Sequence, residues 1–139
     1  AGVPADSCIE YHGRIDEARC EFCGRTYDVS PAQAAGHRQC RVCDGTLGPG
    51  IVLAGEPPAK SDRLLAWARA ESCDLYVAAG SRLTVHPTVE NAEYALETGA
   101  ELAVLSDRQT ALDSEADYRI SGDPGSTLSK LRDALAIMG

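Results

Sequence analysis

From Ile51 to the end of the sequence, short apolar runs alternate with longer segments in which apolar residues recur at helical spacing. Each run is bounded by Gly, Asp or Ser, which is typical of strands buried on both faces of a parallel sheet. The predicted strands are Ile51–Ala54, Leu75–Ala79, Leu102–Leu105 and Tyr118–Ile120. We therefore expect an α/β layer fold with right-handed crossovers.

Three helices are expected among these strands. Ser61 is a candidate N-cap for the first, in which leucines and alanines lie near one face. The second runs from about residue 88 to 98 and ends at Gly99, a residue suited to a helix C-cap. Ser126 is a candidate N-cap for the third, which also has leucines at helical spacing.

The first 48 residues follow a different pattern. Residues 8–13 predict a short strand that ends in a turn at Gly13. Residues 14–48 are polar and rich in cysteine, so they predict a small module that buries little apolar surface. We expect a strand segment at 1–13, this module at 14–48, and the α/β segment at 49–139.

Charge and hydropathy exclude some classes of protein. The formal net charge is −8, with 21 acidic residues against eleven arginines and two lysines, so nucleic-acid binding is not expected. No run of 18 apolar residues occurs, and the first residues resemble no signal peptide, so neither a membrane span nor secretion is expected. The sequence does not begin with Met, which we interpret as a sign of a processed or excised piece. We expect a cytoplasmic protein.

Four of the six cysteines fall in two Cys-x-x-Cys pairs that are separated by sixteen residues. Such pairs place four thiolates at the corners of a tetrahedron about 2.3 Å from a zinc ion. Because protein ligands fill all four positions, the predicted zinc is structural and leaves no place for a catalytic water. The alternative is two reducible pairs or four buried thiols. The predicted ligands are Cys20, Cys23, Cys40 and Cys43.

Other residues near the pairs are given simpler interpretations. Gly24 and Gly45 relax the backbone where such turns require it. His37 is close enough in sequence to be a ligand, but four thiolates already complete the shell, so we expect a surface residue. Cys8 and Cys73 are expected to be small buried side chains.

The order of these features resembles the sirtuin family of NAD-dependent protein deacetylases. A strand with Glu-Tyr-His-Gly precedes the zinc module, and Pro-Gly-Ile-Val-Leu-Ala-Gly-Glu follows it. Further matching segments are Gly-Ser-Arg-Leu from Gly80, Val-His-Pro from Val85 and Gly-Asp-Pro-Gly from Gly122. The resemblance covers essentially all 139 residues and implies a partial, Rossmann-like parallel sheet with a zinc-ribbon module.

The resemblance also implies roles. His12 takes the position of the general base that removes a proton from a ribose hydroxyl, and the pKa of imidazole suits this task. Gly80 and Ser81 follow a strand at the carboxyl edge of the sheet, where a Gly lets amides approach the NAD phosphates. Ser106 corresponds to the residue that holds the adenine ribose, and Asp123 lies in a turn near the adenine. The segment expected to bind the acyl-lysine peptide is Val52, Leu53, Ala54, Gly55 and Glu56.

The sequence also departs from the family pattern. The glycine-rich first turn and the Gln-Asn-x-Asp motif of the amino-terminal half do not occur in it. Ala54 replaces a large aromatic residue, Ser106 an Asn, and His86 a Tyr. We therefore expect a truncated sirtuin that lacks the amino-terminal NAD-binding motifs and is inactive by itself. Three alternatives stay open for the amino-terminal half: absence from this sequence alone, loss from the gene, or supply by another chain as a partner.

Two other functions remain open at this point. One is a catalytically inactive, zinc-stabilised binding module derived from a sirtuin. The other is an unrelated nucleotide-binding α/β domain, such as the cofactor domain of some thiamine-diphosphate enzymes, with an inserted zinc ribbon.

Overall fold

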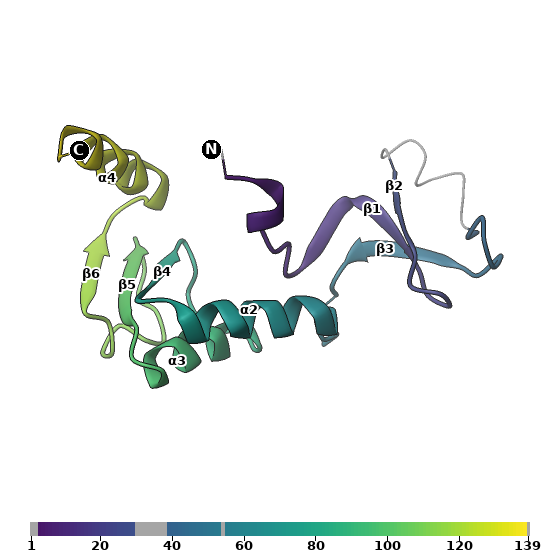
Figure 1. The fold of residues 1–139 in the computed structure, drawn as a ribbon, viewed down its shortest axis with the longest axis horizontal. Coiled ribbons are helices and arrows are strands. Elements are labelled where there is room, and N and C mark those ends of the chain that lie inside the picture. Colours follow the sequence, from purple (N-terminus) through teal and green to yellow (C-terminus); the bar gives the residue numbers. More distant parts are fainter. Residues whose placement is uncertain (1–2, 30–38, 54, 139) are drawn as a thin grey trace. The chain divides into compact units, whose positions relative to one another are not determined.

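The structure is a computed structural model, and it describes residues 3–29, 39–53 and 55–138 (Figure 1). The chain divides into two compact units, Ala1–Leu64 and Leu65–Gly139. The mixed α/β fold with a parallel sheet is confirmed, because the second unit contains three parallel strands. Within the described residues, no helix has both the length and the apolar character needed to cross a membrane.

The first unit contains an antiparallel sheet in the order β2-β1-β3. A short 3-10 helix, η1 (Ala5–Ser7), precedes β1 (Gly13–Cys20), and β2 (Thr26–Asp28) and β3 (Leu47–Ile51) flank it. Two strand predictions were therefore misplaced. The strand predicted at residues 8–13 is irregular at 8–10, and β1 begins only at Gly13, where that strand was expected to end. The strand predicted at Ile51–Ala54 shares only its first residue with β3, which ends at Ile51.

Two glycines allow β1 and β3 to come unusually close. A Cβ on Gly13 would lie 2.0 Å from the Gly50 carbonyl oxygen, and a Cβ on Gly50 would lie 2.6 Å from that of Glu17. The strand register shifts between Gly13 and Ala18, which is where these close contacts occur. Pro49 is tolerated in β3 because this strand lies at the edge of the sheet.

Helix α2 (Lys60–Ser72) contains the boundary between the two units. Ser61 lies inside this helix, and its hydroxyl donates to the Asp62 carboxylate at 3.2 Å. The predicted N-cap role of Ser61 is therefore wrong. Cys8, predicted to be buried, is exposed, and Cys73 is only partly buried.

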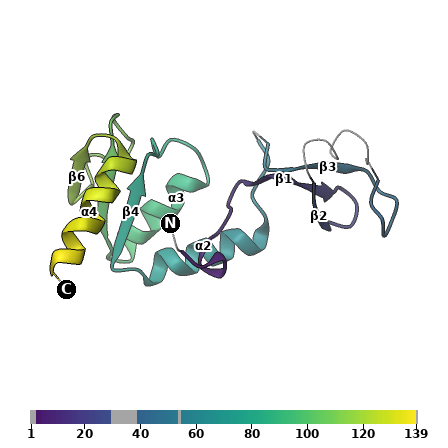
Figure 2. The same cartoon turned by 90° about the horizontal axis from the view of Figure 1, so that it is seen from above.

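The second unit has a parallel sheet in the order β4-β5-β6, with the strands side by side in Figure 1, and Figure 2 labels its outer strands β4 and β6. As predicted, helices alternate with these strands. Their bounds are β4 (Leu75–Ala79), α3 (Thr88–Glu97), β5 (Glu101–Ser106), β6 (Tyr118–Ser121) and α4 (Pro124–Met138). The central strand β5 is buried from Leu102 to Ser106, as expected of a strand covered on both faces.

The core of the second unit lies between α3 and one face of this sheet. Val89 and Ala92 of α3 pack with Ala78 of β4 and with Leu102 and Val104 of β5. The opposite face of β4 carries apolar side chains that are about half exposed, Leu75 at 47% and Val77 at 46%.

Candidate functional site

The four predicted cysteine ligands come together in the first unit. Their sulfur atoms all lie within 4.8 Å of one another, and Cys20 and Cys40 are each only 1% exposed. The Sγ atoms are 3.5 Å apart for Cys20 and Cys43, and 3.6 Å apart for Cys23 and Cys40. A tetrahedron of zinc–sulfur bonds of about 2.3 Å has sulfur atoms about 3.8 Å apart, so the cluster fits a zinc ion. A disulfide would need about 2.05 Å.

The two Cys-x-x-Cys turns repeat one backbone geometry. The Gly24 amide donates to the Cys20 carbonyl at 2.9 Å, and the Asp44 amide donates to the Cys40 carbonyl at 3.0 Å. Both donors have left-handed backbones, with φ of 73° at Gly24 and 55° at Asp44. The prediction that Gly45 supplies backbone freedom is thus wrong, because Asp44 occupies the corresponding position.

Gly45 is required for space instead. A Cβ at this position would lie 2.9 Å from the Cβ of Phe22 and 3.0 Å from the sulfur of Cys20. The Gly45 carbonyl also accepts from the Cys40 amide at 2.7 Å, which closes the second cysteine turn. Any side chain here would push a ligand sulfur out of place.

Tyr27, which the sequence analysis missed, contacts the cysteine cluster directly. Its hydroxyl lies 3.0 Å from the Cys40 sulfur. This hydrogen bond is the main reason why the pKa of Cys40 is lowered to about 6. At Cys43 the Gly45 amide favours the thiolate, but burial and hydrogen bonds with the other thiols prevail and raise the pKa to about 12. A metal ion would therefore displace protons from this cluster.

His12 lies in a turn immediately before β1 and is exposed. Its ring stacks edge-on against Tyr11, with centroids 5.6 Å apart. Its carbonyl accepts from the Val52 amide at 2.9 Å. The candidate base and the candidate peptide-binding segment are therefore joined by a main-chain hydrogen bond.

The predicted peptide-binding segment follows β3 as irregular backbone. The Leu53 amide donates to the Glu56 carboxylate at 3.1 Å, and the Glu56 amide donates to the Leu53 carbonyl at 3.0 Å. Gly55 has a φ of 90°, which makes this a tight turn. Ala54 and His37 lie outside the described residues.

The four predicted NAD-binding residues lie at the carboxyl edge of the parallel sheet. Gly80 follows β4, Ser106 ends β5, and Asp123 follows β6. Gly80 also approaches Pro124, since a Cβ on it would lie 3.6 Å from the Pro124 side chain. Ser81 accepts from the Leu83 amide at 3.2 Å, which leaves its own hydroxyl proton to donate.

Two of these residues also stabilise their own loops. Ser106 is 3% exposed and accepts from the Arg108 amide at 3.1 Å. Asp123 accepts from the Ser126 amide at 2.7 Å, so Asp123 caps α4 and the predicted cap Ser126 lies inside the helix. Each of these hydrogen bonds uses only part of the side chain's hydrogen-bonding capacity, and a bound nucleotide would use the rest.

Arg119 is a second residue that the sequence analysis missed. From β6 it donates to the carbonyls of Ser106 at 2.9 Å and Arg108 at 2.7 Å, and it pairs with the Asp113 carboxylate at 3.1 Å. The pKa of Asp113 is lowered by the Thr110 hydroxyl and by this guanidinium. Arg119 therefore holds the loop that follows Ser106.

Comparison with known proteins assigns this α/β chain, with its cluster of four cysteines, to a protein family. The model of the Sir2 family matches residues 1–87, and the chain belongs to this family. NAD-dependent protein deacetylase 1 of Pyrobaculum aerophilum is 33% identical over 130 residues, covering 91% of this chain and 51% of that protein. The NAD-dependent protein deacetylase of Oceanobacillus iheyensis is 36% identical over 112 residues, covering 81% and 47%. The chain thus spans about half the length of these relatives.

Solved structures share the fold. A structure from work on the mechanism and regulation of Sir2 enzymes is 30% identical, with a TM-score of 0.78 over 94% of this chain and 55% of that one. A Sir2 protein bound to an acetylated peptide has a TM-score of 0.81 over 93% and 56%. At 22% identity, the second comparison shows the fold alone. Family membership removes the unrelated nucleotide-binding domain from consideration.

Proposed function

We propose that this chain forms the carboxyl half of a sirtuin-type, NAD-dependent protein-lysine deacylase. The observation that carries the proposal is the hydrogen bond from the Val52 amide to the His12 carbonyl. It holds the candidate general base beside the segment that would pair with the acyl-lysine peptide. Two relatives are named NAD-dependent deacetylases, and one solved Sir2 protein binds an acetylated peptide, which supports this substrate class.

NAD fits the residues at the carboxyl edge of the parallel sheet. Ser81 retains a hydroxyl proton for a phosphate, and Gly80 has no side chain to keep a phosphate away. Ser106 would hydrogen-bond the adenine ribose, and Asp123 would lie near the adenine. When bound, NAD supplies the ADP-ribose that accepts the acyl group. His12 would accept a proton from a ribose hydroxyl.

The peptide would be held by Val52 and by the turn from Leu53 to Glu56. Leu53 is 47% exposed, so its side chain and backbone are accessible to an extended peptide. Ala54 would leave the acyl-lysine channel wider than an aromatic residue would. We expect this to relax the preference among acyl groups.

The zinc would be structural in this proposal. Its four thiolates leave no open coordination position, so it would fix the two cysteine turns and take no part in the reaction. Four reduced thiols also fit a reducing compartment such as the cytoplasm.

Activity would further require a glycine-rich turn and a Gln-Asn-x-Asp segment, neither of which the sequence contains. The uncovered face of β4, with Leu75 and Val77 half exposed, is consistent with further structure packing there. We expect the 139-residue chain alone to leave an acetylated peptide unchanged. Without these segments, the chain would be a zinc-stabilised module without catalysis.

The test compares the chain alone with the same chain fused behind the amino-terminal half of the Pyrobaculum aerophilum deacetylase. The fusion should release nicotinamide from NAD in the presence of acetylated peptide, and His12→Ala should abolish this release while zinc content stays at one ion per chain. His86→Ala is a matched control, because His86 lies outside the proposed site. A fusion that keeps its activity after His12→Ala would refute the role of His12.

A further inference from the structure

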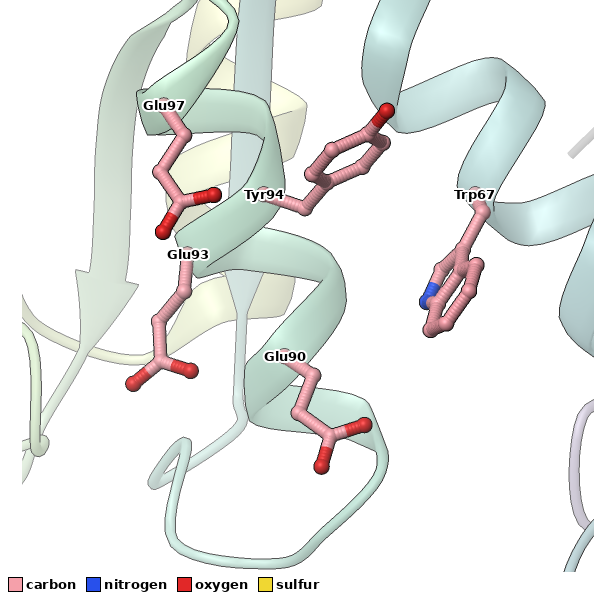
Figure 3. A pocket seen from close by; sticks show the side chains of 5 residues that line it. All are labelled: Trp67, Glu90, Glu93, Tyr94 and Glu97. Carbon is pink, nitrogen blue, oxygen red and sulfur yellow. The ribbon is translucent and has the colours of Figure 1, made fainter.

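A cavity of about 510 Å³ opens between α2 and α3 within the second unit. Its volume lies in the range of about 300–1,000 Å³ that is typical of ligand pockets. None of its residues belongs to the site proposed above. The lining residues, shown in Figure 3, are Trp67, Glu90, Glu93, Tyr94 and Glu97.

Two aromatic rings form the apolar part of this cavity. Trp67 of α2 and Tyr94 of α3 project toward each other across the space between the helices, with ring centroids 6.2 Å apart and planes tilted by 45° (Figure 3). Trp67 remains 39% exposed, so part of its indole is accessible from solvent. An accessible indole face attracts cations, and Trp is the strongest of the aromatic residues in this respect.

The remaining lining residues are all acidic. Glu90, Glu93 and Glu97 occupy positions i, i+3 and i+7 of α3, so they share one face with Tyr94. Glu90 contacts His86 Nδ1 at 3.1 Å, whereas Glu93 and Glu97 form no ion pair within the part of the chain that the structure describes. Like charges at this spacing destabilise a helix. Among the described residues that line the cavity, none is basic and could offset these charges.

We propose that this aromatic and acidic groove binds a basic peptide segment, with an arginine side chain against Trp67. The planar guanidinium can stack on the indole while its N–H groups face the carboxylates. A metal ion is a poorer occupant, because the only group of metal-ligating side chains among the described residues is the cysteine cluster. This inference does not depend on the proposed deacylase activity.

The sequence supplies a local probe, because Trp67 is the only tryptophan. Its fluorescence is followed while the 139-residue chain is titrated with a capped tetra-arginine peptide. The same peptide with citrulline in place of arginine keeps nearly the same shape, has a carbonyl oxygen in place of one nitrogen donor group, and carries no charge. We expect a saturable change with arginine that weakens as salt is raised, and little change with citrulline.

The double variant E93Q/E97Q should bind the arginine peptide about threefold to tenfold more weakly, because it removes two exposed charges. Both glutamates are exposed, so the fold should survive, which circular dichroism checks. E71Q/E115Q is the matched control, since it removes two exposed glutamates elsewhere and should bind as the parent chain does. No fluorescence change, equal binding of citrulline, or equal weakening by both double variants would overturn the proposal.

Discussion

Replacing Tyr27 with Phe should weaken zinc binding while leaving all four ligands in place. The substitution removes one hydroxyl, which lies 3.0 Å from the sulfur of Cys40. Loss of an outer-shell partner of a metal ligand typically costs about 10- to 100-fold in metal affinity. We expect the lower part of this range, because Cys40 is one of four ligands and the others keep their contacts.

The effect should also depend on pH. The Tyr27 hydroxyl is the main cause of the lowered pKa of Cys40, about 6. Without this hydroxyl the pKa moves back toward the ordinary value for a thiol, about 8.5. The loss of affinity should therefore be largest at and below the lower of these values, shrink as the pH rises between them, and vanish in more alkaline solution, where no proton competes with zinc for Cys40 in either protein.

The measurement is a competition between the protein and a coloured zinc chelator, with zinc stoichiometry checked by native mass spectrometry. Tyr118→Phe is the matched control, because it removes a hydroxyl bonded to Glu101 at 3.2 Å in the other unit. It should leave zinc affinity unchanged. Unchanged affinity in folded Tyr27→Phe, or an equal loss in the control, would refute the proposed role of this hydrogen bond.

Three further predictions follow from the structure. Gly45→Ala should lower zinc affinity at least tenfold in the same competition, because the new Cβ displaces a ligand sulfur, whereas Gly125→Ala in α4 should leave it unchanged. Arg119→Met should lower the free energy of unfolding of the second unit by about 2 kcal/mol, seen as faster hydrogen exchange in β5 and β6. Arg132→Met, at an exposed ion pair, should change it by less than about 0.5 kcal/mol. Zinc chelation should raise hydrogen exchange in β1 and β3 and leave β4 to β6 protected; exchange that does not change in β1 would contradict a structural metal.

The parallel sheet could be predicted from the sequence because its strands are apolar runs bounded by turn residues. The first unit could not be predicted as well. Strand β1 is mostly polar, and Ile15 within it is 91% exposed, so hydrophobic periodicity carries little signal there. The close approach of Gly13 and Gly50 and the cysteine cluster shape this sheet instead. The predicted N-cap at Ser126 was wrong as well, because Asp123 caps α4 and Ser126 lies inside the helix.

The candidate metal centre could be predicted because ligand spacing is written directly in the sequence. Tyr27, Arg119 and Trp67 could not, because their partners are far away in the chain and are brought near only by folding. The contact between Tyr27 and Cys40 spans thirteen residues, and that between Trp67 and Tyr94 spans twenty-seven. Nothing in the type or spacing of these residues distinguishes them from ordinary surface or core residues.

Strand β1 begins one residue after His12 and ends at Cys20, a ligand of the candidate metal centre. At about 3.3 Å per residue, its eight residues extend over roughly 26 Å. An oxidant or a chelator that opens the thiol cluster would release the Cys20 end of β1 and make the end next to His12 less ordered. The backbone next to the candidate base His12 would therefore depend on a metal centre at the far end of the same strand.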